Sequence, residues 1–249
     1  MSTLWTEDPR TVATYDTECA GRHDHDFYLA LAAELRARTV VDVGCGTGVF
    51  VTDLAQRGFR AIGVDPSAQM LEVARTREGG DLATWIHGTA ADLPAGTADL
   101  VVMMGHVAQY FLDEDAWQHA LSHVHRALRA GAHLAFESRQ PDRGWPSRWT
   151  RERTETTFEH PDGGTFTSWV EVTEVVGTSD SFTETHVGHT DLPDGTHLAH
   201  AETLRFRSEE EIRAGLRAAG FAVENLWGDW DRSPVTTGSD ELIVLARRD

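Results

Sequence analysis

The chain has 249 residues, 40% of them hydrophobic, which is enough to bury one substantial core. It has 22 Lys and Arg against 40 Asp and Glu, a formal net charge of −18. So acidic a surface repels phosphate backbones and anionic lipid headgroups, which argues against nucleic acid and membrane partners. The two cysteines, Cys19 and Cys45, lack disulfide-framework spacing, and MSTLWTEDPR does not resemble a signal peptide. We therefore expect a cytoplasmic protein.

The segment before the first strand is predicted to be helical, with one helix running into Val40. Its apolar positions are Phe27, Leu29, Leu31, Ala32 and Leu35. Two interpretations stay open: a helix that covers a sheet edge, or a lid over a ligand that carries Tyr15 and the cluster 23–26. We assign residues 1–38 to an N-terminal helical lid.

From Val40 onward, short apolar runs alternate with helical stretches. Strands are expected at 40–43, 61–64, 83–86, 100–104 and 133–137, and helices at 49–57, 70–75 and 117–128. In the last helix, apolar residues repeat at intervals of four, three and four, as on one buried helix face. Strands that alternate with helices predict a mainly parallel sheet covered on both faces.

The pattern changes between residues 148 and 207, where no helical stretch is convincing. Alternating Thr, Val, Phe and Trp residues are interrupted by turn clusters at 160–164, 177–180 and 192–196. Three turns imply four antiparallel strands in a meander. A helix is expected at 208–219, where Ser208 and Glu211 form a capping box. Two strands, 221–227 and 241–246, then close the chain.

The strongest functional signal is VVDVGCGTG, residues 40–48. A buried strand runs into Gly44, Gly46 and Gly48, which let the backbone turn sharply and approach a ligand closely. The exposed N–H groups at the following helix start favour an anionic group. Asp65 ends the second strand, where a carboxylate can accept both ribose hydroxyls of an adenosine ligand. The alternative is a tight turn without a ligand.

The glycine spacing separates two cofactors. A dinucleotide fingerprint reads G-x-G-x-x-G, whereas this loop reads G-x-G-x-G, with Val49 where the last dinucleotide glycine would fall. DVGCGTG, followed by GVDPS and GTAADLP, resembles the class I S-adenosylmethionine-dependent methyltransferases. The resemblance spans roughly Tyr15 to the end. It implies a Rossmann-like α/β fold with a seven-stranded sheet, S-adenosylmethionine as cofactor and S-adenosylhomocysteine as product.

The resemblance also implies site residues. The glycine loop would line the methionine part of the cofactor, Asp65 the ribose and Asp92 the adenine amine, while Gly105 and His106 would lie beside the transferred methyl group. Asp92 has the alternative of a plain turn-former, and Asp42 either binds the cofactor ammonium or braces the loop. The predicted cofactor-binding set is Asp42, Gly44, Cys45, Gly46, Gly48, Asp65, Pro66, Met70, Ala91, Asp92 and Gly105.

The reacting end is predicted from GHVAQYF, residues 105–111. His106 suits a general base, with backbone capping as the alternative. Tyr110 and Tyr15 would place their rings beside the sulfonium or the substrate, or fill the core. For substrate binding, Arg139 either holds a carboxylate or pins the chain entering the insertion. Trp145 and Trp149 are pocket walls or ordinary packing.

Two groups of histidines suggest metal binding but are not predicted to bind one. His119, His123 and His125 lie on one expected helix, but the buried face belongs to other residues and no acidic or thiolate cluster completes a ligand set. His186, His189, His197 and His200 fall in the meander. We interpret them as surface polarity, with the alternative that one faces the pocket.

These observations predict a methyltransferase acting on a small molecule, with N, O or C as acceptor. The core would comprise 39–147 and 208–249, and the antiparallel insertion 148–207 would roof the active site after strand 5. Such insertions sometimes support dimers, so a homodimer is a further expectation. The competing hypotheses are an NAD-dependent oxidoreductase, a non-catalytic protein that binds adenosyl ligands, and an RNA methyltransferase, which the charge disfavours.

Overall fold

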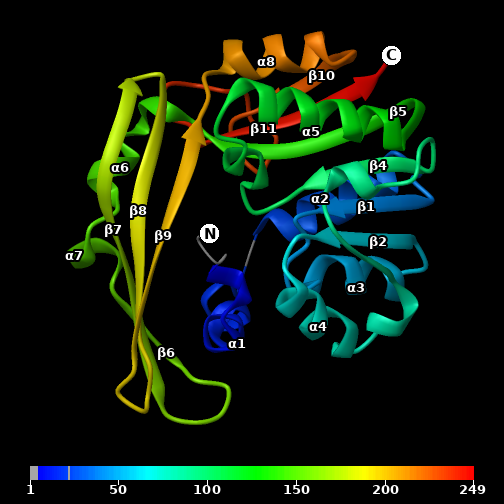
Figure 1. The fold of residues 1–249 in the computed structure, drawn as a ribbon. Helices are drawn as coiled ribbons and strands as arrows, with labels where there is room; N and C mark the ends of the chain where they lie inside the picture. Colours follow the sequence, from blue (N-terminus) through cyan, green and yellow to red (C-terminus); the bar gives the residue numbers. More distant parts are fainter. Residues whose placement is uncertain (1–4, 22) are drawn as a thin grey trace.

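The computed structural model describes residues 5–21 and 23–249 and contains two separate sheets (Figure 1). The larger sheet has the strand order β10-β11-β5-β4-β1-β2-β3. Its strands are β1 (Thr39–Val43), β2 (Arg60–Asp65), β3 (Thr84–His87), β4 (Ala98–Met103), β5 (Leu128–Arg139), β10 (Phe221–Trp227) and β11 (Glu241–Arg248). The first five run parallel, and β11 is antiparallel to both of its neighbours. The predicted seven-stranded sheet is confirmed.

Helices cover both faces of this sheet. They are α2 (His23–Glu34), α3 (Val49–Gln56), α4 (Ala68–Thr76), α5 (Glu114–Ala127) and α8 (Glu209–Ala218). On one face, Trp117 and Leu121 of α5 and Leu216 of α8 pack with alternate residues of β4. On the other, α2 and α3 bury Leu31 and Leu54 against the remaining β4 residues. This explains why the strands are apolar throughout rather than alternating.

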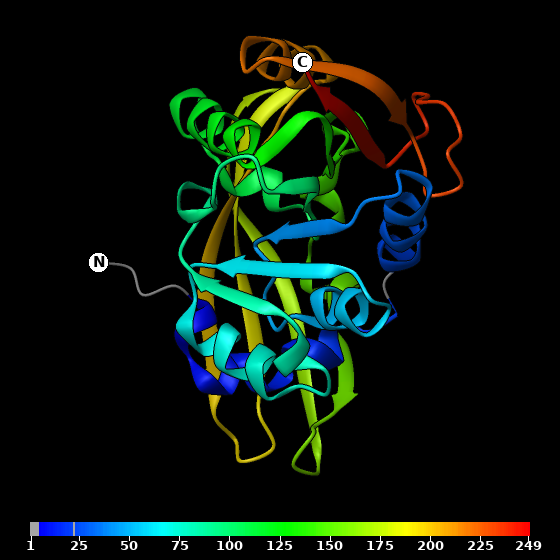
Figure 2. The same cartoon turned by 90° about the vertical axis from the view of Figure 1, so that its right-hand side faces the viewer.

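The second sheet is antiparallel, with the order β6-β7-β8-β9. Its strands are β6 (Thr156–Glu159), β7 (Thr165–Thr178), β8 (Ser181–Asp191) and β9 (His197–Phe206). They confirm the predicted insertion after strand 5. In Figure 2 this sheet lies behind the larger one, and its β6–β7 and β8–β9 turns extend below it. Burial alternates along β8, so even-numbered residues form an inward face that carries Phe182, Leu204 and Phe206.

Short helical segments complete the described chain. They are η1 (Trp5–Glu7), η2 (Gly80–Leu82), η3 (Ala90–Asp92), η4 (Val107–Tyr110), η5 (Pro141–Arg143), α6 (Trp145–Arg148) and α7 (Arg151–Thr154). The prediction of no helix in 148–207 is wrong at α7, whose four residues are too few to show a helical period. Strand β5 is also longer than predicted, because Leu128 already pairs with Ala98 of β4.

The N-terminal segment contains two helices. Helix α1 (Pro9–Glu18) is capped by Asp8, whose side chain accepts from Arg10 N. Helix α2 is the helix predicted from the apolar positions between Phe27 and Leu35, and it ends at Glu34 instead of running into Val40. Helix α1 contacts both α4 and β6, between the two sheets (Figure 1). Residues 1–4, Arg22 and the side chain of His23 belong to the predicted lid but lie outside the described residues. No helix in the described part of the chain is long and apolar enough to cross a membrane.

Candidate active site

A cavity of about 1160 Å³ opens at the carboxyl ends of β1, β2, β3 and β4, closed on one side by η1 and α1. Small-molecule sites in proteins commonly occupy about 300–1,000 Å³, so this one has room for a cofactor and an acceptor. Many predicted site residues line it: Tyr15, Asp42, Gly44, Cys45, Gly46, Asp65, Pro66, Met70, Ala91, Gly105 and Tyr110. Others do not: Gly48, Asp92, His106, Arg139, Trp145 and Trp149.

The glycine loop has left-handed backbone at all three glycines, with φ of +76°, +53° and +76° at Gly44, Gly46 and Gly48. A Cβ at Gly46 would lie 3.6 Å from the Tyr15 ring, an ordinary contact distance, so the left-handed backbone rather than lack of space favours glycine there. A Cβ at Gly48 would lie 2.4 Å from Trp85. Gly48 therefore allows α3 to pack closely, which explains why it does not line the cavity.

Asp65 lies at the end of β2 and joins the glycine loop to the next helix. One carboxylate oxygen accepts from Gly46 N at 2.8 Å and the other from Ser67 N at 2.8 Å. Burial raises the pKa of Asp65, and these two hydrogen bonds oppose that rise. Each oxygen has two lone pairs, so the carboxylate retains capacity for ligand hydroxyls.

Two neighbouring residues after β3 take different positions. Ala91 lines the cavity, whereas the Asp92 carboxylate accepts from Thr89 N at 2.9 Å in a capping box.

Two histidines of α5, His119 and His123, also line the cavity. Their i, i+4 spacing is visible in the sequence, but the sequence did not predict that they face the cavity. Among residues 5–21 and 23–249, no three ligating side chains gather to hold a metal ion.

The second sheet meets the cavity through aromatic residues. The Tyr110 hydroxyl donates to Glu202 Oε1 of β9 at 3.0 Å. Trp5, which lines the cavity, stacks on His200 of β9 with ring centroids 5.1 Å apart and lies 5.8 Å from the Tyr15 ring. The cavity therefore lies between the glycine loop and the inward face of β9.

The His106 side chain contacts β11 and does not line the cavity, where the sequence predicted it beside the transferred methyl group. Its backbone is left-handed, with φ of 64°, and its N–H donates to Glu137 Oε1 at 2.7 Å. The imidazole Nε2 lies 3.0 Å from each carboxylate oxygen of Glu241. Burial raises the pKa of Glu241 to about 7. The role of His106 as a base stays a prediction, because its side chain faces β11.

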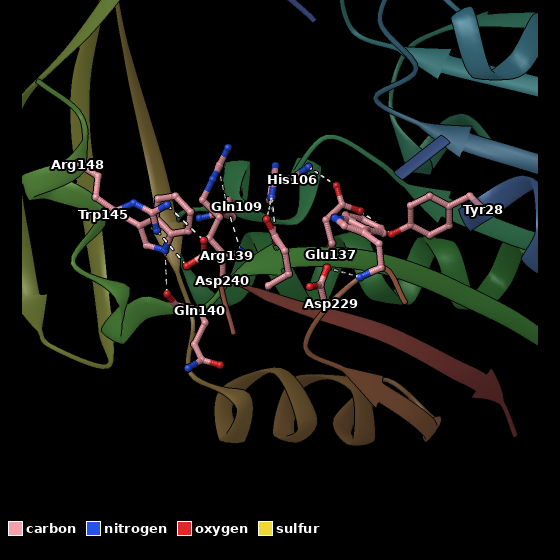
Figure 3. Close-up of polar contacts among 12 residues, drawn as sticks. Tyr28, His106, Gln109, Glu137, Arg139, Gln140, Trp145, Arg148, Asp229 and Asp240 are labelled. Carbon is pink, nitrogen blue, oxygen red and sulfur yellow. Dashed lines mark hydrogen bonds and ion pairs between the residues drawn. The ribbon is translucent and has the colours of Figure 1, made fainter. Parts of the chain in front are cut away.

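Glu137, which the sequence analysis did not single out, fixes this loop. It is fully buried at the end of β5 and also accepts from the Tyr28 hydroxyl of α2 at 2.5 Å (Figure 3). Burial raises the pKa of Glu137. One carboxylate therefore connects the N-terminal helices to the backbone after β4. An acidic residue ending a buried strand was the only sequence signal.

Arg139, Trp145 and Trp149 form a cluster beside the second sheet. Arg139 Nη1 donates to Gln109 Oε1 at 3.0 Å (Figure 3). Its guanidinium lies 5.0 Å from the Trp149 ring centroid and 5.6 Å from that of Trp145. Trp145 Nε1 donates to Gln140 O at 2.9 Å. These contacts fix the cluster, and its predicted role in substrate binding stays a prediction.

The inward face of the second sheet holds a buried polar chain. His186 Nδ1 lies 3.0 Å from Glu184 Oε2, and His186 Nε2 lies 3.2 Å from Glu202 Oε2. Interpreting His186 as surface polarity was therefore wrong, because this residue is 6% exposed. Burial alone would lower the pKa of His186, but the hydrogen bonds to Glu184 and Glu202 outweigh burial and raise the pKa to about 9.

This raised pKa predicts a pH dependence of folding. A histidine with a higher pKa in the folded state stabilises the fold fully below its ordinary value of 6.5, and the contribution is lost as pH rises through about 9. We expect the unfolding free energy to fall by about 1–3 kcal/mol between neutral pH and pH above 9. Denaturant unfolding of the protein and of His186→Asn measures this. An equal decline of the unfolding free energy in the unmodified protein and in His186→Asn would contradict this prediction. His160→Gln is the control and should behave like the unmodified protein.

Comparison with known proteins adds to this geometry. A family described as "Methyltransferase domain" matches residues 40–131, which contain the glycine loop and Asp65. Residues 40–131 are therefore similar to this methyltransferase domain family. An uncharacterised methyltransferase of Mycobacterium tuberculosis is 32% identical over 111 residues, 44% of each protein. The chain thus matches less than half the length of this relative.

Two further similar proteins match more of the chain. The cypemycin N-terminal methyltransferase of a Streptomyces species is 28% identical over 220 residues, 86% of this chain and 84% of that protein. The solved structure of CalS10, an amino pentose methyltransferase from Micromonospora echinaspora with bound S-adenosylmethionine, has a TM-score of 0.68 and 21% identity and covers 95% of both chains. Because the match covers 95% of this chain, the structural similarity extends over the second sheet as well as the larger one.

The cavity fits S-adenosylmethionine. Asp65 offers a carboxylate acceptor at the end of β2, and Gly44 and Gly46 place backbone without side chains in the neighbouring wall. Met70 and Ala91 supply apolar wall, as an adenine ring requires. The donors, acceptors and apolar surface are therefore present in one cavity.

Proposed function

We propose that the protein transfers a methyl group from S-adenosylmethionine to a small-molecule acceptor, at N, O or C. The observation that carries this proposal is one cavity that joins the glycine loop and Asp65 to Tyr15 and Tyr110. The cofactor supplies a methyl group that is already activated. The chain must therefore align the acceptor, exclude water and, where needed, remove a proton.

Each end of the cavity has its own residues in this proposal. Asp65 binds the ribose, Gly44 and Gly46 line the methionine part, and Asp42 binds the ammonium group or braces the loop. Ala91 lines the adenine end, and a contact between Asp92 and the adenine amine stays a prediction, because Asp92 does not line the cavity. Tyr15 and Tyr110 line the acceptor end. The second sheet forms the roof.

Nitrogen is the first acceptor to test. Two similar proteins are named as an N-terminal methyltransferase and an amino pentose methyltransferase, and both names describe amine-bearing substrates. The net charge of −18 supports a small molecule over RNA. A homodimer formed through the insertion stays a prediction.

The rival functions differ in what they require of the cavity. An NAD-dependent oxidoreductase requires a third dinucleotide glycine, and Val49 occupies that position. A non-catalytic adenosyl-binding protein requires no space beyond the cofactor, whereas this cavity reaches Tyr110 and Trp5 beside the second sheet. Both observations favour methyl transfer.

A methyl-transfer screen tests the proposal. The protein is incubated with S-adenosylmethionine and a panel of small amines, phenols and indoles, and products are detected by a gain of one methylene in mass. We expect at least one amine to be methylated, with S-adenosylhomocysteine formed in equal amount. Consumption of the cofactor without a methylated product, or no product across the panel, would contradict the proposed activity.

The β7–β8 hairpin of the second sheet provides a further prediction. Its turn, residues 177–180, lies away from the cavity, and Ser181 next to it donates to Glu211 of α8 at 2.7 Å. Replacing 177–180 with a two-residue Asn-Gly turn should leave the affinity for S-adenosylhomocysteine within about threefold, while turnover or acceptor range changes. Calorimetry and the screen measure both. Lost cofactor binding in a folded variant would show that the insertion belongs to the cofactor site.

A further inference from the structure

The inward face of the second sheet contains a chain of polar side chains that starts at the cavity. Tyr110 lines the cavity and donates to Glu202 Oε1, 3.0 Å away. Glu202 Oε2 and His186 Nε2 are 3.2 Å apart, and His186 Nδ1 and Glu184 Oε2 are 3.0 Å apart. Hydrogen bonds therefore run without a break from the acceptor end of the cavity to β8.

The chain becomes more buried with distance from the cavity. Tyr110 is 46% exposed, the Glu202 side chain is 13% exposed, and Glu184 is fully buried. Glu184 Oε1 has no hydrogen-bond partner among the described residues. Burying a carboxylate with one oxygen unused costs stability, and Phe182, Leu204 and Phe206 show that apolar residues pack on this same face. Stability alone therefore does not account for three ionisable residues here.

The contacts of His186 orient Glu202 toward Tyr110. His186 lies between the carboxyl groups of Glu184 and Glu202. It holds Glu202 by Oε2, leaving Oε1 to Tyr110. Glu202 is thereby oriented as a proton acceptor for Tyr110.

We propose that Tyr110 and Glu202, held in place by His186 and Glu184, form a relay that takes the proton released by the acceptor. This deepens, and rests on, the proposed methyl transfer. The acceptor's proton passes to the Tyr110 oxygen as the Tyr110 proton passes to Glu202 Oε1, so Tyr110 ends unchanged and Glu202 ends neutral. The proton then leaves from Glu202 to solvent. Tyr110 is the catalytic residue, and His186 and Glu184 are positioning residues.

Other titratable groups surround the relay and enter its pH dependence. Arg139 and Tyr15 lie near Tyr110, and His200 lies near Glu202. His200 also lies near His186. None of these groups interrupts the hydrogen-bonded chain, but their charges shift the pH at which it operates.

The test compares Glu202→Gln with Glu174→Gln, a matched change at an exposed residue of β7. The first readout needs no acceptor: NMR of ring-¹⁵N histidine, with His186 assigned by its loss in His186→Asn. We expect the His186 titration midpoint to fall by about one pH unit or more in Glu202→Gln and to stay unchanged in Glu174→Gln. Calorimetry with S-adenosylhomocysteine should give equal affinities for the unmodified protein, Glu202→Gln and Glu174→Gln.

The second readout is turnover against pH, using an amine methylated in the screen. Glu202→Gln should lower kcat about 10²-fold at neutral pH with KM nearly unchanged, and the loss should shrink as pH rises because hydroxide replaces the relay. An unchanged kcat and pH profile, or an unchanged His186 midpoint, would overturn the relay. If Glu202→Gln does not fold, Tyr110→Phe tests the same step. Failure to bind S-adenosylhomocysteine would instead overturn the proposed function.

Discussion

Replacing Asp65 with Ala is expected to weaken S-adenosylhomocysteine binding by about 1.5–3 kcal/mol, the scale of hydrogen bonds to a charged group. This corresponds to a roughly 10- to 150-fold higher Kd. The variant loses the acceptor for the ribose hydroxyls and also the bond from Gly46 N that shapes the glycine loop. Isothermal titration calorimetry measures the change.

Asp99 provides a matched control for this variant. Its carboxylate also holds two backbone amides, accepting from Arg38 N at 2.9 Å and Thr39 N at 2.8 Å, but it does not line the cavity. Asp99→Ala should lower stability without changing the affinity for the ligand. If both variants lose affinity equally, the effect is general loosening, and Asp65 has no direct contact with the ribose.

Replacing Tyr110 with Phe is expected to lower turnover by about 10²–10⁴, the contribution of a well-placed proton-transfer group. The ring stays, so affinity for S-adenosylhomocysteine should be nearly unchanged. Only the hydroxyl, which donates to Glu202 at the cavity wall, is lost. Steady-state kinetics with a methylated amine, together with calorimetry, separates these two effects.

His106→Ala is the comparison, because the sequence analysis predicted His106 as the base. The His106 imidazole faces Glu241, so we expect a smaller loss of turnover than in Tyr110→Phe, arising from movement of the loop after β4. His106→Asn retains a hydrogen bond without titrating in this range. A loss of about 10²–10⁴ in both His106 variants, with normal turnover in Tyr110→Phe, would assign the base role to His106.

The sequence placed the glycine loop and Asp65 at one edge of the sheet because these residues are close in the chain. The glycine loop directly follows β1, and Asp65 ends the next strand, so parallel pairing of β1 with β2 brings them to the same edge. Residue periods and turn clusters predicted the strands of both sheets for the same local reason. Apolar spacing predicted helix α2 but not α1, because α1 has few apolar residues.

The acceptor half depends on contacts between distant segments. Tyr110 and Glu202 are 92 residues apart, Tyr28 and Glu137 are 109 apart, and His106 and Glu241 are 135 apart. No local pattern predicts such pairs, since each depends on how the second sheet and β11 pack on the core. The same limit explains His186, a histidine in an alternating strand whose inward face is buried only once the sheet docks.

The most direct test of the central claim is calorimetry of the unmodified protein with S-adenosylhomocysteine and with NAD under the same conditions. The glycine spacing, Asp65 and the cavity predict one S-adenosylhomocysteine bound per chain and no measurable heat with NAD. Binding of NAD with no binding of S-adenosylhomocysteine would contradict the account.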